Sequence, residues 1–182
     1  MQLETQRLIL RPFTEGDAQD VYDYAKDPRV GPAAGWKPHE SVEESREIIR
    51  TVFSEPDVFA VVDKESGKVI GSAGFTGRHR KELPDPDDEI GYSLHPGYWG
   101  RGLMPEAVAA LLRYGFEDRK LATIWCDHYD GNQKSKRVIR KSGFTFRFLR
   151  MQKVPTYDNA TRLALCYAMT REEWQKRREE QA

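Results

Sequence analysis

Short apolar runs recur along the chain, and their spacing separates strands from helices. Alternating or β-branched runs predict strands at 7–11, 58–62, 69–75, 89–94, 123–126, 144–149 and 162–169. Apolar residues that recur every three or four positions predict helices at about 17–27, 41–52, 105–118 and 133–141. A strand, a helix and a second strand in succession over 89–126 predict a right-handed parallel crossover. The pattern therefore favours a mixed sheet with helices packed on it.

The connections between these elements are rich in turn residues. Glu65-Ser66-Gly67-Lys68 joins two adjacent β-branched runs and predicts an antiparallel hairpin. Residues 29–40 carry glycine and proline turns around a large aromatic residue, and residues 77–88 are too polar and proline-rich for anything but a surface loop. Thr170 and Glu173 predict the start of a last, charged helix, which we expect to fray over 175–182.

The stretch from 89 to 107 combines a strand, a glycine-containing loop and the start of a helix. Gly100 and Gly102 let the backbone turn, and Pro105 suits the first turn of a helix, where its missing N–H costs nothing. The first N–H groups of a helix have no intrahelical partner, so this loop predicts a cradle for an anion such as phosphate. Walker and dinucleotide-binding loops are excluded, because Leu103 follows Gly102 and Pro105 stands where the last glycine would be. A simple turn between a strand and a helix is the alternative.

Two motifs resemble those of the GCN5-related N-acetyltransferase (GNAT) superfamily. The first comprises Glu89-Ile90-Gly91-Tyr92, Tyr98-Trp99-Gly100-Arg101-Gly102 and Glu106-Ala107, and its details are similar to the RimJ/RimL-like subgroup of ribosomal-protein acetyltransferases. The second is Asn132-x-x-Ser135 followed by Gly143-Phe144. The resemblance extends over nearly the whole chain. It implies a single GNAT-like domain over 1–182, of α+β or α/β class, with a mixed central sheet of about six to seven strands flanked by helices on both faces.

The resemblance also implies a cosubstrate, acetyl-CoA. In the family, the loop amides hold the coenzyme pyrophosphate, the residue at Asn132 bonds the pantetheine arm, and the residue at Ser135 faces the thioester sulfur. The implied coenzyme contacts are Tyr92, Ser93, Leu94, Trp99, Gly100, Arg101, Gly102, Leu103, Met104, Pro105, Asn132 and Ser135. Taken alone, Asn132 and Ser135 are equally typical of an ordinary helix N-terminus.

Acetyl transfer to an amine requires a base for the amine and an acid for the departing thiolate. Glu89 is the candidate base, since its strand runs beside the thioester in the family; a surface ion pair is the alternative reading. Many family members place an acidic Tyr seven residues after the Asn, where this chain has Ile139. Ser135 is therefore the candidate acid, as in the RimL-like subgroup, and Tyr129 is the second candidate. A backbone N–H within 92–94 is expected to polarise the carbonyl.

The acceptor pocket is expected around the first two helices, because the corresponding segment lines it in the family. Trp36 and His39 are the candidate substrate-binding residues, and the alternative is an anchoring Trp with a solvated loop His. The polar loop at 77–88 is expected to border the same pocket.

Composition narrows the class of protein. A length of 182 residues argues for one domain. Positive and negative side chains balance at 29 each, which argues against a surface that binds nucleic acid or a membrane. No apolar run is long enough to cross a membrane, so we expect a cytoplasmic protein. Cys126 and Cys166 lie in apolar runs and form no C-x-x-C motif, which predicts reduced core thiols and no metal site.

The sequence thus predicts an enzyme that transfers the acetyl group of acetyl-CoA to a primary amine by direct attack on the thioester. A protein N-terminal α-amine and a small amine are both candidate acceptors. A catalytically silent acyl-CoA binding or sensing module is the competing hypothesis, and it would share the loop at 99–105 without using Glu89 or Ser135. Both a monomer and a homodimer remain open.

Overall fold

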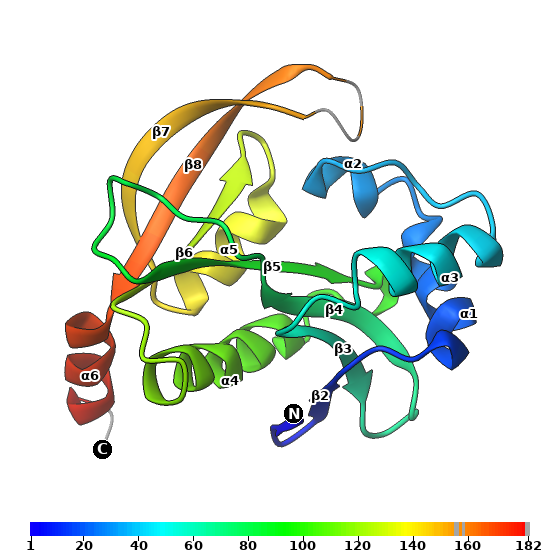
Figure 1. Ribbon diagram of the computed structural model, residues 1–182, viewed down its shortest axis with the longest axis horizontal. Helices are drawn as coiled ribbons and strands as arrows, with labels where there is room; N and C mark the ends of the chain where they lie inside the picture. Colours follow the sequence, from blue (N-terminus) through cyan, green and yellow to red (C-terminus); the bar gives the residue numbers. More distant parts are fainter. Residues whose placement is uncertain (155–156, 158, 181–182) are drawn as a thin grey trace.

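The computed structural model describes residues 1–154, 157 and 159–180, which form a mixed sheet with helices on both faces (Figure 1). The eight strands lie in the order β1-β2-β3-β4-β5-β6-β8-β7. Their bounds are β1 Leu3–Glu4, β2 Leu8–Arg11, β3 Val58–Asp63, β4 Val69–Phe75, β5 Asp87–Leu94, β6 Thr123–Tyr129, β7 Thr145–Lys153 and β8 Thr161–Thr170. The expected mixed sheet is confirmed, with one strand more than the predicted six to seven. The extra strand, β1, has only two residues, too few to show an alternating pattern.

The described residues contain six α-helices. They are α1 Ala18–Ala25, α2 Gly31–Ala34, α3 Val42–Thr51, α4 Leu103–Glu117, α5 Gln133–Lys141 and α6 Arg171–Glu180, with two 3₁₀ turns, η1 Glu15–Asp17 and η2 Pro96–Tyr98. Four of them, α1, α3, α4 and α5, follow the predicted periodic segments, and α6 follows the predicted capping residues Thr170 and Glu173. In α2 the turn residues themselves make a single helical turn, with Pro32 in its first positions and Gly35 as a left-handed C-cap.

The core has two layers, one on each face of the sheet. Alternation along β3 divides them: Val61 packs with Leu111 of α4, whereas the neighbouring Ala60 and Val62 pack with Val21 of α1. Helix α4 therefore covers one face, and α1 with α3 covers the other. Both cysteines are buried and reduced, as predicted.

The sheet opens between β5 and β6, its parallel pair. These strands are in register only from Asp87↔Thr123 to Glu89↔Trp125. Beyond Glu89, β5 continues along β4 and β6 continues along β8, so residues 90–94 and 126–129 diverge. We call this opening the β5–β6 fork; Figure 1 shows the two strands separating towards α2. Both predicted motifs lie at its mouth.

Helix α6 extends further than the sequence led us to expect. It is helical to Glu180, although we predicted fraying from residue 175; residues 181–182 lie outside the described part of the chain. Arg177 donates from Nη1 to the Gly143 carbonyl at 3.1 Å, and Arg178 forms an ion pair with Glu117 of α4. These contacts hold the last turns against the body of the domain. None of the described helices is long and apolar enough to cross a bilayer.

Candidate active site

The loop after β5 turns through two left-handed glycines before α4 begins. Gly100 and Gly102 have φ of 79° and 75°, a region in which other residues are strained, and Gly102 is the N-cap of α4. Arg7 fixes the loop from outside, because its Nη1 donates to the Arg101 carbonyl at 3.0 Å and its guanidinium pairs with Glu106 at 2.7 Å. The glycines therefore have the role that the sequence pattern required.

The amides of this loop are available to a ligand. Trp99 N–H donates to the Pro96 carbonyl at 3.2 Å, and regular bonding resumes where Glu106 N–H donates to the Gly102 carbonyl at 3.3 Å. Between them, no acceptor in the described part of the chain takes a hydrogen bond from the N–H groups of residues 100–104. Pro105 has no N–H to offer. A run of unpaired donors at a helix N-terminus is suited to an anion. We call it the N–H cradle.

The Trp99 side chain faces the fork rather than the cradle. Its indole Nε1 donates to the Leu94 carbonyl at 2.8 Å. Its ring lies 3.9 Å from Lys134 Nζ and 5.6 Å from the Arg29 guanidinium carbon, so it joins α5 to the segment before α2. Ser93, next to Leu94, is buried and bonds the Ser72 hydroxyl at 2.8 Å.

Two predicted residues meet across the fork. The Tyr92 hydroxyl on β5 lies 2.8 Å from the Ser135 hydroxyl on α5. Burial raises the pKa of Tyr92, so the phenol stays protonated and can donate to Ser135. Asn132 Oδ1 accepts from Ser135 N–H at 3.1 Å, the geometry of an N-cap, and Asn132 Nδ2 donates to the Ala33 carbonyl of α2 at 3.2 Å. The N-cap reading of Asn132 is thus correct for the structure, and it coexists with a position at the fork.

Glu89 lies at the apex of the fork, on the face opposite α4, and only 5% of it is exposed. Thr76 Oγ1 donates to Glu89 Oε2 at 2.8 Å, and Arg78 Nη1 is 3.2 Å from the same oxygen. Burial raises the pKa of Glu89, the Asp127 carboxylate raises it further, and Arg78 opposes both. The carboxyl group is therefore a stronger base than an exposed Glu, although it does form an ion pair.

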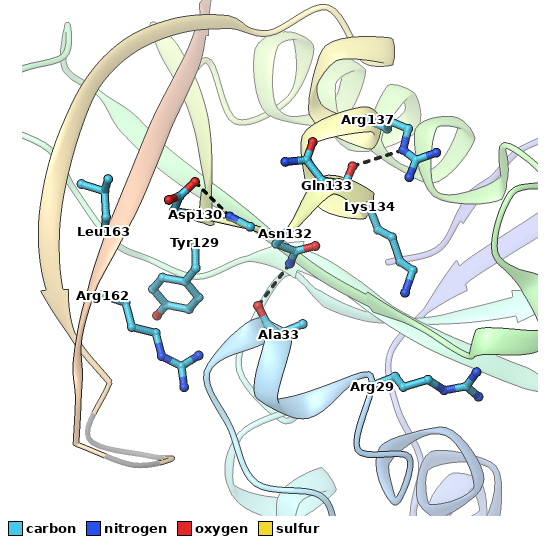
Figure 2. Close-up of a pocket in the computed structure, with 11 residues that line it drawn as sticks. Arg29, Ala33, Tyr129, Asp130, Asn132, Gln133, Lys134, Arg137, Arg162 and Leu163 are labelled. Carbon is cyan, nitrogen blue, oxygen red and sulfur yellow. Dashed lines mark hydrogen bonds between the residues drawn. The ribbon is translucent and has the colours of Figure 1, made fainter.

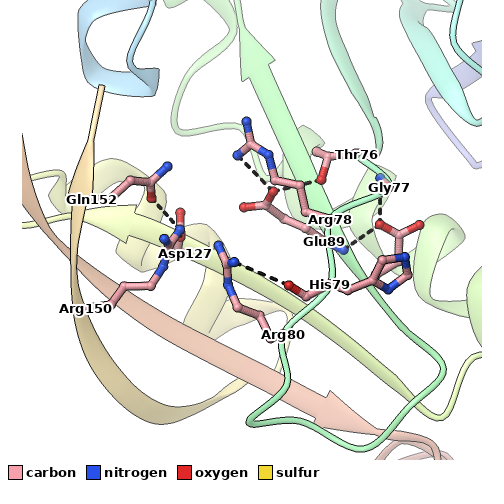
Figure 3. Close-up of polar contacts among 10 residues, drawn as sticks. Thr76, Gly77, Arg78, His79, Arg80, Glu89, Asp127, Arg150 and Gln152 are labelled. Atoms are coloured by element: carbon pink, nitrogen blue, oxygen red, sulfur yellow. Dashed lines mark hydrogen bonds and ion pairs between the residues drawn. The ribbon is translucent and has the colours of Figure 1, made fainter. Parts of the chain in front are cut away.

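Charged residues beside Glu89 were missed by the sequence reasoning. Asp127 on β6 pairs with Arg150 on β7 at 2.6 Å, and the Arg80 guanidinium carbon lies 4.3 Å from the centre of the Trp125 ring. Figure 3 shows these side chains converging from three strands and the loop at 77–86. One signal was available: Asp127 is a charged residue within the otherwise apolar or aromatic start of a strand, on the same face as Trp125. We expected the polar loop to border the acceptor pocket, and one residue of this loop, Arg80, lies beside Glu89.

A cleft of about 710 Å³ opens beside the fork (Figure 2). It is lined by Arg29, Ala33, Tyr129, Asp130, Gly131, Asn132, Gln133, Lys134, Arg137, Arg162 and Leu163. Tyr129, the second candidate acid, lies in this cleft under the Arg162 guanidinium, 5.4 Å from its carbon. Burial is also the main cause that raises the pKa of Tyr129.

The two residues predicted to bind the acceptor do not line this cleft. His39 is buried, its Nδ1 is 2.8 Å from the Ser45 hydroxyl of α3, and burial lowers its pKa. Trp36 packs against the core cluster of α1 and α3, with its ring 5.4 Å from that of His39. Neither side chain lines the cleft. This geometry favours an anchoring role for Trp36, whereas His39 is buried and does not line the cleft.

In the described part of the chain, one group of side chains has metal-ligand spacing. His79, Asp85 and Asp87 place their ligating atoms within 4.8 Å of one another under the loop at 77–86. Asp87 is already occupied, because its Oδ2 accepts from Arg80 N–H at 2.9 Å.

Comparison with known proteins agrees with this geometry. Residues 7–145 match the family model described as an acetyltransferase (GNAT) domain. The N-acetyltransferase p20 of Bacillus licheniformis is 30% identical over 147 residues, covering 78% of this chain and 81% of the relative. The [ribosomal protein uS5]-alanine N-acetyltransferase of Escherichia coli is 26% identical over 156 residues, covering 79% and 78%. A GNAT-family acetyltransferase structure from Bacillus anthracis superposes with a TM-score of 0.81 at 26% identity, covering 95% of this chain and all of that one.

The chain therefore belongs to the GNAT family of acetyltransferases. Members of this family use acetyl-CoA as cosubstrate. This protein is therefore an acetyl-CoA-dependent N-acetyltransferase.

Proposed function

We propose that this enzyme binds acetyl-CoA in the β5–β6 fork and transfers the acetyl group to the α-amine of a peptide or a similar primary amine. The observation that carries the proposal is the arrangement of the fork, with the N–H cradle at its mouth and the buried carboxyl of Glu89 at its apex. A donor bound at one end thus reaches a base at the other.

The donor side follows from the unpaired amides. The N–H groups of residues 100–104 bind the pyrophosphate, and the dipole of α4 adds to the attraction. The pantetheine arm then lies along residues 90–94, whose fork-facing backbone groups are not paired with β6. A backbone N–H of this segment polarises the thioester carbonyl.

The acceptor amine enters from the face of the sheet opposite α4, where Glu89 and Asp127 lie. We call this side of the sheet the acceptor face. The amine nitrogen attacks the thioester carbonyl carbon, and Glu89 accepts the amine proton directly or through a water molecule. The C–S bond then breaks, and the leaving sulfur receives a proton from the Ser135 hydroxyl, which lies 2.8 Å from the Tyr92 hydroxyl. Water then returns a proton to Ser135 and takes up the proton held by Glu89, which restores both groups. The choice of a peptide α-amine is supported by the likeness to the uS5-alanine N-acetyltransferase.

Thiol release tests this proposal directly. Purified protein is incubated with acetyl-CoA and a panel of amino-terminal peptides, small amines and polyamines, while coenzyme affinity is measured by calorimetry. We expect coenzyme binding together with thiol release above background for peptide α-amines. Tight binding without release for any acceptor would instead support the silent acyl-CoA binding module. Absence of both would contradict the placement of the coenzyme in the fork.

A further inference from the structure

Two of the arginines on the acceptor face are neutralised by carboxylates. Arg78 pairs with Glu89 at 3.2 Å and Arg150 pairs with Asp127 at 2.6 Å. Asp87, beneath the loop, is 2% exposed and accepts its bonds from Arg80 N–H and from His79. The buried carboxylates Glu89, Asp127 and Asp87 are therefore already engaged.

Arg80 differs from the other two, because no carboxylate in the described part of the chain lies within ion-pair distance of it. Its guanidinium stacks on Trp125 at 4.3 Å, and its Nη1 makes one long contact, 3.4 Å, with the carbonyl of His79. Its Nε is buried and has no acceptor. A guanidinium offers five N–H donors in a planar fork, and leaving them without acceptors in a partly buried place is costly.

The backbone holds Arg80 in this position. Its N–H donates to Asp87 Oδ2 at 2.9 Å, and its carbonyl accepts from Leu83 N–H at 3.0 Å. Figure 3 shows its guanidinium between Asp127 and Glu89. The positive charge of Arg80 also lowers the pKa of the Glu89 carboxyl. The site thus presents a fixed, unpaired cation beside the proposed base.

We propose that Arg80 binds a carboxylate of the acceptor, so that the preferred substrates are amines that carry an acidic group close to the reacting nitrogen. This inference rests on the proposed function, because it places the amine at Glu89. A planar guanidinium pairs with a carboxylate through two parallel hydrogen bonds, which fixes the orientation of the ligand as well as its charge. Acceptors with several amines meet the unpaired charge of Arg80 instead and are repelled.

The acidic group has two possible sources, which matched acceptors distinguish. Alanine compared with alaninamide tests the α-carboxylate of a free amino acid. The peptide amides Ala-Glu and Ala-Gln test the side chain of a second residue. Each pair changes one charge while the reacting amine is retained.

The experiment measures kcat/KM for these four acceptors with the wild type, Arg80→Gln, Arg80→Lys and Lys81→Gln. Lys81 is exposed on the same loop, so its substitution removes an equal charge without touching the stacked position. We expect the wild type to prefer the acidic member of one pair by roughly tenfold or more, the size of one charge-assisted hydrogen bond. Arg80→Gln should abolish that preference, so that the acidic and the neutral member of the pair react with the same kcat/KM. Lys81→Gln should keep the preference, and Arg80→Lys should retain part of it.

A binding measurement keeps the inference independent of turnover. Calorimetry with CoA-saturated protein compares N-acetylalanine and N-acetyl-Ala-Glu-amide with their neutral counterparts in the same variants. If no acceptor releases thiol, the proposed function fails, but a tenfold loss of acidic-ligand binding in Arg80→Gln would still support the carboxylate site. The inference is overturned if the wild type shows no preference in either pair and no selective binding, or if Arg80→Gln keeps the preference. Should Arg80→Gln not fold, the comparison of Arg80→Lys with Lys81→Gln decides in the same way.

Discussion

The buried position that makes Glu89 a useful base also lowers the stability of the folded protein at neutral pH. Its pKa is raised first by burial and then by Asp127, so the folded state retains a proton that the unfolded chain releases near pH 4.5. The stability that this proton contributes is fully present below about pH 4.5 and is lost as the pH rises through the folded pKa. At neutral pH, where the base must be ionised, the enzyme has lost that contribution.

Glu89→Gln should separate activity from stability. We expect kcat/KM to fall on the order of 10²–10⁴-fold, because general-base catalysis is removed. The midpoint of thermal unfolding should rise relative to the wild type at pH 7–8, and the difference should vanish below about pH 4.5, where both states of the wild type are protonated. Thiol release and thermal scans from pH 4 to 8 check both effects. Glu65→Gln, on an exposed hairpin turn, is the control. An unchanged rate would remove Glu89 from the mechanism.

The hydroxyl pair across the fork gives a second prediction at the scale of single residues. Ser135→Ala should lower kcat on the order of 10²-fold and leave coenzyme affinity within about twofold, because the hydroxyl acts on the leaving sulfur and not on the phosphates. Tyr92→Phe should cost less, and the double variant should lose little more than Ser135→Ala alone, since the two hydroxyls are 2.8 Å apart and act as a unit.

Ser142→Ala is the matched control for this series. Ser142 follows the same helix, α5, and its hydroxyl is buried with no partner among the described residues. Its removal should leave kcat unchanged. Full turnover in Ser135→Ala would instead favour Tyr129, the other hydroxyl beside the fork, as the acid.

At the scale of elements, a left-handed glycine in the N–H cradle can be compared with one in an ordinary turn. Gly102 has φ of 75° in the cradle, and Gly67 has φ of 69° in the β3–β4 hairpin with open space around it. Asp at either position carries the same backbone strain and the same charge. Only Gly102→Asp should abolish CoA binding in calorimetry, because it sets a carboxylate against the pyrophosphate. Equal affinity in the two variants would contradict the position of the cradle.

The same scale explains what the sequence could and could not predict. The loop at 99–105 and the start of α5 were predictable, because their glycines, Pro105 and Asn132 have local roles in turning or capping the chain. Helix α2 was not predictable. Two of its carbonyl groups accept hydrogen bonds from residues far away in sequence: Ala33 from Asn132 and Pro32 from Arg162. No local pattern records such partners.

The charged residues of the acceptor face were not predicted, for a related reason. Asp127, Arg150 and Arg80 come from β6, β7 and a loop, and they meet only because β8 pairs with both β6 and β7. The β7–β8 pairing also shifts register between Phe146 and Phe148, which changes the face on which each later residue lies. A pattern of alternation alone does not fix that face, so the loop at 99–105 and the start of α5 were predictable and the position of these charged residues was not.

At the scale of the molecule, the sheet consists of two halves joined at the fork. Antiparallel pairing is extensive within β1–β5 and within β6–β8, whereas three register pairs connect β5 to β6. A ligand that bonds both halves should therefore stabilise the whole domain. At a coenzyme concentration of 100 times Kd the gain is about 2.7 kcal/mol, which corresponds to a rise in Tm of about 5–10 °C for a chain of this size.

Amide hydrogen exchange should show which segments of the chain bound CoA stabilises. The N–H groups of residues 100–104 have no acceptor in the described part of the chain, so they should exchange quickly in the free enzyme and slow most when CoA is added. Residues 90–94 should slow less, because β5 already pairs with the antiparallel strand β4 along this segment. The hairpin turn at 64–68 should not change, and Gly102→Asp should show neither the protection nor the rise in Tm. Cradle amides that exchange at one rate with and without CoA would show that the phosphates lie elsewhere.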